Sequence, residues 1–449
     1  MKHPETPPAF AKIFPTVTKD TNRFIEVVRL SNDERYKGQY LHWDKVKRLH
    51  PPQGFSREEV WMSLKFSRIG MRQIPLTDSK GNNFQFCVPD IVLKELHEID
   101  IGAGGALGVP EPITNPQTKD RYLIRSLMEE AITSSQLEGA ATTREVAKEM
   151  IRTGRAPRDT GEQMILNNFV TMQTITELKK EALTPKMVFA IHKLVTEKTL
   201  DDATAAGRFR RPDELRVVGD DYGEVFHAPP PAEQLEARLA AMCDFANGVT
   251  PPYFVHPVLR AIMLHFWLAY DHPFVDGNGR TARALFYWSM LRENCWLFEF
   301  ISISHILRKA PAKYGRSFLY TETDDNDLTY FIVAQTQVIK RAIEALHSYV
   351  DAKTAEMQEL ESRVRAINLF NHRQAALIRH ALKHPFQVYT FGSHQKSHQV
   401  AYQTARTDLL DLQAKGLFDA RKRGRKIAFT SPDDLSSRLR KVGKTAEKA

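Results

Sequence analysis

The sequence has few cysteines and nothing that resembles a secretory signal. Its three cysteines, Cys87, Cys243 and Cys295, are scattered and odd in number, and none has the spacing of a metal ligand. This pattern excludes a disulfide framework and a cysteine-based zinc site. Together with the missing signal, it favours a reducing, cytoplasmic setting.

Long apolar runs are missing as well. The most apolar stretch, residues 258–270, is interrupted by Arg260 and His265. It is shorter than the roughly 20 residues that a helix needs to cross a bilayer. The stretch therefore predicts a buried core helix, and we expect no membrane partner.

Charge is unevenly distributed along the chain. The net charge is +9, and from residue 371 to the end 16 Lys and Arg stand against 6 Asp and Glu. The preceding part is close to neutral, so the basic excess belongs to the C-terminal segment. A chain of 449 residues can bury a large core and is expected to hold two or three domains.

The densest group of chemically active residues lies at 272–283, which read His-Pro-Phe-Val-Asp-Gly-Asn-Gly-Arg-Thr-Ala-Arg. A Gly-Asn-Gly turn that opens a helix can point backbone N–H groups at an oxyanion, and the helix N-terminus adds positive potential. Arg280 and Arg283 are three residues apart and share one helix face. Asp276 offers oxygen ligands to a hard divalent cation. His272 titrates near neutrality and is the candidate base.

This stretch resembles the signature of the Fic family, His-x-Phe-x-Asp/Glu-Gly-Asn-Gly-Arg-x-x-Arg, and matches it at every specified position. The resemblance extends over about residues 119–350. Family members transfer a nucleotide monophosphate, usually AMP from ATP, to a hydroxyl group of a target protein. The resemblance therefore implies a mainly α fold, with a Fic-type helical bundle and a small β-hairpin flap.

Carried over position by position, the resemblance assigns a role to each signature residue. His272 would take the proton from the attacking Tyr, Ser or Thr hydroxyl, and Phe274 would anchor the loop against the core. Asp276 would ligate Mg²⁺ between the α- and β-phosphates of ATP. The phosphates would be held by Gly277, Asn278, Gly279, Arg280 (at the β-phosphate) and Arg283 (at the γ-phosphate).

Two extended runs, residues 215–218 and 224–227, enclose a Gly-Asp-Asp-Tyr-Gly turn and predict a β-hairpin within residues 213–228. In the family such a flap lies beside the active site and aligns the target segment by strand addition. The best match for its edge is Glu224, Val225, Phe226 and His227. An ordinary surface hairpin is the alternative interpretation.

A second motif lies far upstream, where residues 134–139 read Ser-Ser-Gln-Leu-Glu-Gly. Ser134 and Glu138 share a helix face, and Gly139 is a natural helix stop. The motif resembles the Fic inhibitory sequence Ser/Thr-x-x-x-Glu-Gly/Asn, whose glutamate pairs with the second signature arginine, here Arg283. The resemblance implies an inhibitory helix at about residues 122–139 and an autoinhibited enzyme. Some relatives use this glutamate to remove AMP, so a deAMPylase or a bifunctional enzyme stays an alternative.

The segments outside the signature predict further structure. Residues 1–107 are expected to form an N-terminal α+β extension, with a helix at 56–66 that Ser56 caps and a strand at 84–88. Residues 102–116 are rich in Gly and Pro and predict a loop. His256 and His265 favour structural roles. Tyr314 and Tyr320 could border an adenine pocket or pack in the core.

The basic C-terminal segment resembles a winged helix. After a connecting helix at 351–370, helices are expected at 373–383 and within 397–415, followed by a basic hairpin at 421–426 whose tip is Gly424. We place the winged-helix domain at 371–435, with residues 404–412 as its recognition helix, and a basic tail at 436–449. Its partner would be DNA, through phosphate contacts, or another protein.

Two classes of function follow. The first is an autoinhibited protein adenylyltransferase that uses ATP and Mg²⁺ to modify a hydroxyl side chain of a target protein or of itself. The second is a winged-helix nucleic-acid-binding regulator with a nucleotide-sensing Fic domain. The intact signature favours the enzyme, because a retired active site would have lost His272 or an arginine. The target and the formation of a homodimer are left open.

Overall fold

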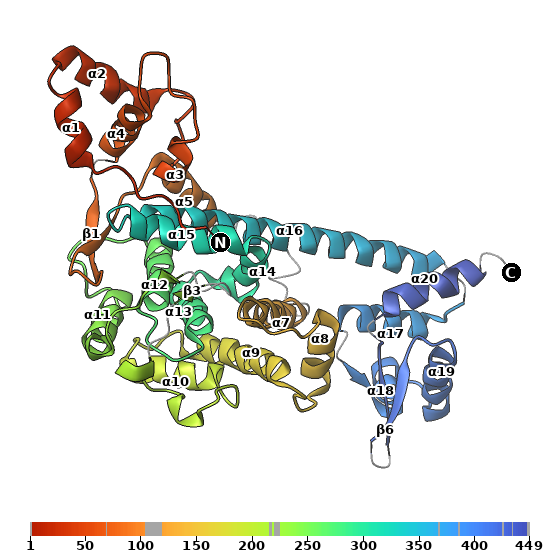
Figure 1. The fold of residues 1–449 in the computed structure, drawn as a ribbon. Helices are drawn as coiled ribbons and strands as arrows, with labels where there is room; N and C mark the ends of the chain where they lie inside the picture. Colours follow the sequence, from red (N-terminus) through yellow and green to blue (C-terminus); the bar gives the residue numbers. More distant parts are fainter. Residues whose placement is uncertain are drawn as a thin grey trace. The chain divides into compact units, whose positions relative to one another are not determined.

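The computed structural model describes residues 2–446 except 69, 104–118, 215–217, 220–224, 367–368, 385–386, 424–425 and 433. The chain divides into two compact units (Figure 1). The first contains Met1–Leu107 and Ser126–Ile343, and the second contains Gly108–Arg125 and Glu344–Ala449. Helices make up most of both units, which confirms the mainly α prediction.

The N-terminal part of the first unit is a group of short helices followed by a two-stranded antiparallel sheet. Ser56 and Glu59 form a capping box at the start of the helix predicted there. Apolar side chains of the first helices pack around Trp61. The strand predicted at 84–88 is shorter and ends at Phe86. The elements are α1 (Phe10–Val17), α2 (Thr21–Arg29), η1 (Leu30–Asn32), α3 (Trp43–Val46), α4 (Arg57–Ser67), β1 (Arg72–Thr77), β2 (Asn83–Phe86) and α5 (Asp90–Ala103).

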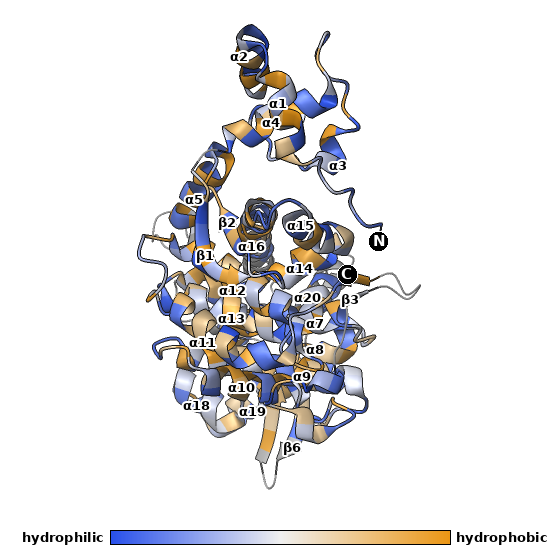
Figure 2. Ribbon diagram, turned by 60° about the vertical axis from the view of Figure 1, so that its left-hand side comes forward, coloured by the Kyte–Doolittle hydropathy of each residue, from blue (hydrophilic) through white to orange (hydrophobic). Residues whose placement is uncertain are grey.

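The remainder of the first unit is built around two consecutive helices, α12 (Pro257–Asp271) and α13 (Asn278–Arg292), in which almost every residue is buried. Buried hydrophobic residues recur along both helices, and Figure 2 colours many positions of α12 and α13 as hydrophobic. The prediction of a buried helix at 258–270 is therefore confirmed. Its polar residues are paired: Arg260 donates to the carbonyl oxygens of Phe245 and Thr250, and the His265 ring bonds the Tyr314 hydroxyl.

Helices α9, α10, α11 and η5 contact this buried pair, and the other helices before and after it complete this part of the chain. Their bounds are α7 (Lys119–Leu137), α8 (Arg144–Thr153), α9 (Thr160–Leu178), α10 (Pro185–Val195), η2 (Ala203–Ala205), η3 (Pro212–Glu214), η4 (Ala232–Gln234), α11 (Leu235–Ala246), η5 (Trp296–Glu299), α14 (Ile303–Arg308), α15 (Pro311–Thr323) and α16 (Thr329–Ala366). The predicted connecting helix at 351–370 is not a separate element, because α16 runs without a break to Ala366.

The predicted hairpin is present as two short antiparallel strands, β3 (Val218–Gly219) and β4 (Val225–His227). The turn between them, with Glu224, and the first run at 215–217 lie outside the described residues. Within the described part of the chain, no helix is long and apolar enough to cross a membrane.

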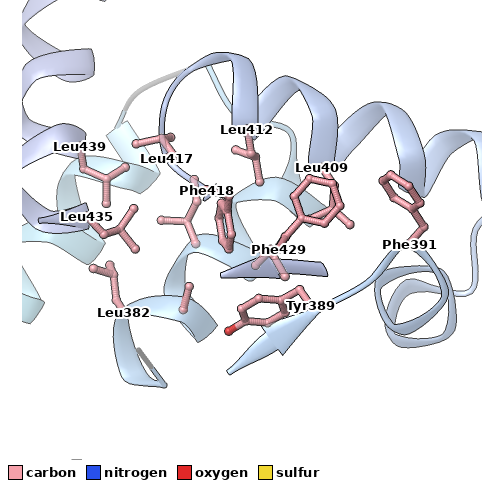
Figure 3. Packing of buried hydrophobic residues seen from close by; sticks show 13 residues of the cluster. Leu382, Tyr389, Phe391, Leu409, Leu412, Leu417, Phe418, Phe429, Leu435 and Leu439 are labelled. Atoms are coloured by element: carbon pink, nitrogen blue, oxygen red, sulfur yellow. The ribbon is translucent and has the colours of Figure 1, made fainter. Parts of the chain in front are cut away.

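The second unit has its own apolar core, in which Phe391, Leu409, Phe418 and Phe429 are buried (Figure 3). A three-stranded antiparallel sheet of order β5-β7-β6 packs with helices in the order helix, strand, helix, helix, hairpin. The elements are α17 (His372–Lys383), β5 (Val388–Tyr389), α18 (Phe391–His398), α19 (Tyr402–Ala414), β6 (Asp419–Arg423), β7 (Lys426–Thr430) and α20 (Leu435–Ala446). Gly424, the expected wing tip, lies outside the described residues.

The C-terminal end differs from the expected basic tail at 436–449. Residues 435–446 form α20, and Leu435 and Leu439 are buried in the core of the unit. Val442 packs against the same core. Apolar residues spaced four and three apart lie on one helix face, so this segment contributes packing as well as charge.

Candidate active site

The signature residues lie at the junction between α12 and α13. His272 follows the last residue of α12 and adopts the left-handed conformation, with φ 44° and ψ 55°. Its backbone N–H donates to the Leu268 carbonyl oxygen at 3.0 Å. Glycine usually occupies this helix-ending position, and a side chain there costs about 1–2 kcal/mol. An imidazole held in this conformation beside the glycine turn is a candidate for a role in chemistry.

The loop after His272 is held by the side chain of Asn278. Its Oδ1 accepts from the Phe274 N–H at 2.9 Å, and its Nδ2 donates to the Phe274 carbonyl oxygen at 2.8 Å. On the other side, Arg210 donates to the His272 carbonyl oxygen at 2.9 Å. The Asn278 side chain therefore stabilises the loop, and only its backbone is left to contact a phosphate.

His192, on α10, is a second support of the loop that the sequence analysis did not identify. Its ring stacks on Phe274 with 3.7 Å between centroids. Its Nδ1 accepts from the Gly207 N–H at 3.0 Å, so Nε2 carries the proton and donates to the Asp276 carbonyl oxygen at 2.9 Å. Burial lowers the pKa of His192 to about 4, which keeps this tautomer neutral. The residue is 80 positions from the loop, so no local pattern could reveal the contact.

At the turn that begins α13, neighbouring side chains occupy the positions that a Cβ atom would need. Gly277 has φ 82°, and a Cβ there would lie 2.6 Å from Thr196 Cγ2. A Cβ on Gly279 would lie 2.2 Å from Glu138 Oε1. Gly277 therefore requires glycine, because its φ is positive and the Thr196 methyl lies in the way, whereas the atom in the way at Gly279 is the far end of the flexible Glu138 side chain. The N-terminus of a helix such as α13 can bind an anion through its backbone N–H groups.

Arg280 is almost fully buried, and its guanidinium has limited pairing. It donates to the Val195 carbonyl oxygen at 3.1 Å and to the Asp276 carboxylate at 3.2 Å. Among the described residues its Nε has no hydrogen-bond partner. Burial lowers its pKa. A buried cation with an unused donor is costly unless an anion satisfies it, so this position suits a phosphate.

The structure brings Ser134 and Glu138 of the upstream motif into contact with Arg283. Arg283 donates from Nε to the Ser134 hydroxyl at 2.8 Å and from Nη2 to Glu138 Oε1, also at 2.8 Å. A third bond joins Nη2 to the Ser134 carbonyl oxygen at 3.0 Å. The side chain of Arg283 is 2% exposed and that of Glu138 is 26% exposed. Glu138 thus covers the open end of the arginine and the surface of Gly279.

His272 opens onto a cavity of about 230 Å³. Burial and the neighbouring His227 lower the pKa of His272 to about 4, so the ring is neutral at pH 7 and able to accept a proton. Tyr314 also borders the cavity, whereas Tyr320 lies elsewhere and stacks on His42 at 4.2 Å. The cavity is lined in addition by Glu138, His227, Gly279, Arg283 and Phe318.

The flap edge borders the same cavity through Phe226 and His227. Val225 is 49% exposed, and the His227 side chain is 9% exposed. His227 therefore faces the protein, and its ring contacts Glu322 and the Tyr270 carbonyl oxygen. The edge offers backbone groups and Val225 to a partner, while the imidazole of His227 is engaged internally.

Asp276 is the carboxylate beside the glycine turn that could bind a metal ion. Among the described residues, no group of three or more His, Cys, Asp and Glu could hold a metal ion. The Asp276 side chain is 54% exposed beside the turn. One carboxylate is enough for Mg²⁺ when phosphate oxygens and water complete its six ligands. The residues present therefore fit a magnesium ion that arrives with a nucleotide.

Comparison with known proteins finds a family match for the part of the chain that contains the signature. Residues 182–290 match the Fic/DOC family model. The chain is 30% identical over 158 residues to "Protein adenylyltransferase Fic" of Nematostella vectensis, and 32% identical over 114 residues to the protein of the same name of Culex quinquefasciatus. The matches cover 34% and 25% of this chain, but only 34% and 21% of those relatives.

A solved structure gives the same fold assignment. The crystal structure of a Fic family protein from Desulfovibrio desulfuricans G20 superposes with a TM-score of 0.51 at 18% identity. The superposition covers 81% of this chain and 99% of that one. At this identity the likeness concerns the fold alone.

Proposed function

We propose that this chain, which carries a Fic/DOC family domain, is a protein adenylyltransferase that moves AMP from ATP to a Tyr, Thr or Ser hydroxyl. The observation that carries the proposal is one arrangement: a neutral His272 beside the glycine turn and the partly unpaired, buried Arg280. A base and an oxyanion site at one helix junction are what transfer to a hydroxyl needs.

The chemistry follows from these positions. The hydroxyl oxygen of the target attacks the α-phosphorus of ATP, and the bond from that phosphorus to the oxygen bridging to the β-phosphate breaks. His272 accepts the hydroxyl proton, and pyrophosphate leaves. Arg280 and the N-terminal N–H groups of α13 neutralise charge on the β-phosphate. Asp276 would hold a Mg²⁺ ion, which supplies further neutralisation when it is bound.

We propose that the structure is the inhibited form of this enzyme. Arg283, the intended partner of the γ-phosphate, already donates to Ser134 and Glu138. ATP could place its γ-phosphate on Arg283 only after the Glu138 carboxylate has moved. The same carboxylate could orient a water molecule, so removal of AMP by Glu138 is the second candidate activity.

Labelled ATP separates these proposals. Wild type, Glu138→Gly and His272→Ala are incubated with α-labelled ATP and Mg²⁺, and labelled residues are located by mass spectrometry. We expect label in Glu138→Gly and almost none in His272→Ala, because a general base contributes about 10²–10⁴-fold. Glu129→Gly is the matched control, since Glu129 lies on the same helix but pairs with Arg144 and His305. Absence of label from every variant would exclude the transferase.

The C-terminal unit has a separate proposed role. We propose that residues 371–435 form a winged-helix domain that contacts DNA through α19 and the basic strand β6. Arg406 and Thr407 are exposed on α19, and Tyr402 is 53% exposed at its start. Duplex affinity should fall steeply with salt, because each phosphate contact releases counterions. If no duplex binds at low salt, a protein partner is the better assignment.

We also propose a reducing compartment, such as the cytoplasm, as the working location. All three cysteines are unpaired and buried, and burial raises the pKa of Cys243 to about 12 and that of Cys295 to about 11. Thiols of this kind are protected and unreactive, and none contributes a disulfide.

A further inference from the structure

The imidazole of His227 lies between two groups that can only accept hydrogen bonds. Its Nε2 is 2.7 Å from the Tyr270 carbonyl oxygen, and its Nδ1 is 2.8 Å from Glu322 Oε2. A carbonyl oxygen and an ionised carboxylate have no proton to give. Both ring nitrogens must therefore donate, and the ring that satisfies both contacts is an imidazolium.

These contacts join three elements at the active site. His227 ends β4, the flap edge; Tyr270 is near the end of α12; and Glu322 is on α15. The His227 ring also packs on the Tyr270 ring, with 4.6 Å between centroids. Tyr270 precedes His272 by two residues. The His227 side chain therefore connects the flap edge to the backbone next to the candidate base.

The charges around His227 support a protonated ring. Burial alone would lower the pKa of His227, but the hydrogen bonds to Glu322 and Tyr270, with the charge of Asp271, outweigh it, so the pKa is raised. Asp271 does not compete for the ring, because its carboxylate is bound by Arg238 and by the Trp267 indole. The Tyr270 phenol and His272 are also close to His227: burial raises the pKa of Tyr270, so the phenol stays neutral, and the His227 charge lowers the pKa of His272.

We propose that His227, kept as an imidazolium by Glu322, is a positioning residue that fixes the flap edge against α12 and keeps His272 unprotonated. The proposal rests on the transferase assignment for its effect on the reaction. The hydrogen-bonded pair itself does not depend on that assignment. His227 acts through its neighbours and contacts no reacting atom.

The pH dependence has a defined sign. Because the pKa of His227 is raised, the charged pair is complete below that pKa and is lost as pH rises through it. While it is charged, His227 opposes protonation of His272, so the base stays available to lower pH. Removing the Glu322 charge should lower the pKa of His227, neutralise the ring and let the pKa of His272 rise.

The test uses Glu322→Gln in a Glu138→Gly background, so that the proposed inhibition is absent. The matched control is Asp100→Asn, which removes a similar contact: His256 Nε2 bonds Asp100 Oδ2 at 3.0 Å, at the other end of α12. The readouts are the auto-modification rate from pH 4 to 9, the ATP affinity by calorimetry, and the imidazole titration of His227 by NMR. A His227→Gln variant assigns the NMR signal.

We expect Glu322→Gln to slow auto-modification about tenfold at pH 7, in line with a misplacement below 1 Å. The acid limb of its pH–rate profile, which reports protonation of His272, should move up by about one pH unit, equivalent to a tenfold change in the proton affinity of His272. ATP affinity and the Asp100→Asn variant should stay unchanged. In the Glu138→Gly parent, the pKa of the His227 ring should lie above the ordinary value of histidine. In Glu322→Gln it should lie below the pKa measured in the parent.

Two results would overturn the proposal. One is a His227 ring whose pKa in the parent is at or below the ordinary value of histidine; this result does not depend on the folding of Glu322→Gln. The other is a folded Glu322→Gln variant with the rate and acid limb of Asp100→Asn. Failure of the transferase assignment looks different, because no variant would then incorporate label while the NMR titration would still report the pair.

Discussion

Replacing Glu138 by glycine should both activate the enzyme and loosen its nucleotide-free form. Arg283 is almost fully buried and makes one charge-assisted bond to Glu138, besides two bonds to Ser134. A bond of that kind contributes about 1.5–3 kcal/mol. Without it, ATP no longer competes with the carboxylate, so productive ATP binding should strengthen about ten- to a hundredfold, at 1.4 kcal/mol for each factor of ten.

The same bond predicts an effect on stability. Without Glu138, the buried guanidinium keeps its Ser134 contacts but loses its counter-charge, so the nucleotide-free variant should be less stable by a similar amount. Adding ATP and Mg²⁺ should then raise its melting temperature more than it raises that of wild type. Thermal unfolding with and without nucleotide measures this difference directly.

A second variant separates charge from volume. Glu138→Gln keeps the size of the side chain and an acceptor oxygen but removes the charge, so its ATP affinity should lie between those of wild type and Glu138→Gly. Calorimetric titration with ATP and Mg²⁺ provides the comparison. Equal ATP affinity in wild type and Glu138→Gly would refute the reasoning, because the carboxylate would then not compete with nucleotide at Arg283.

Four other outcomes are expected. Gly277→Ala should lower stability by about 1–3 kcal/mol in urea unfolding, because a Cβ would meet Thr196 at a positive φ; Gly81→Ala has a similar φ of 85° in open space and should cost less. His192→Leu should slow auto-modification at least tenfold and lower stability by about 1–3 kcal/mol, since the loop loses its bond to Asp276 and the Gly207 N–H loses its acceptor. The auto-modification rate should be constant from about pH 5 up to the raised pKa of His227 and should fall through pH 4 as His272, whose pKa is about 4, takes up a proton; an acid limb near the ordinary pKa of histidine would contradict this. In the second unit, burial acts to raise the pKa of Asp408, but hydrogen bonds from Arg373 and other groups outweigh it and lower the pKa from 3.8 to about 2. The ionised carboxylate therefore contributes about 2.5 kcal/mol of stability, present above pH 3.8 and lost on acidification toward pH 2. Asp408→Asn should remove this contribution at neutral pH, as urea unfolding would show.

The sequence was most informative where contacts are local. Residues 272–283 form one helix end, one turn and one helix start, so spacing alone predicted which side chains share a site. The helix at 258–270 was predictable because apolar residues dominate it despite Arg260 and His265. The upstream motif was linked to Arg283 only through the family resemblance, since the two are far apart in the chain.

Contacts between distant segments could not be predicted. His192 and Glu322 each lie in an ordinary helical pattern, and nothing beside them indicates that one supports the loop and the other charges His227. The last helix was missed for another reason. Its lysines and arginines suggested a solvated tail, while the spacing of Leu435 and Leu439, which buries them together, was the weaker signal.

In the proposed inhibited form, the inhibitory group is Glu138, which lies against Gly279 and belongs to the same chain as the site it covers. Such a tethered competitor has a local concentration that dilution cannot change, commonly in the millimolar range. The balance between open and closed forms should therefore be independent of enzyme concentration and respond to the concentration of nucleotide. We therefore expect the activity of the proposed enzyme to follow the ATP concentration even when the protein is present at a few copies per cell.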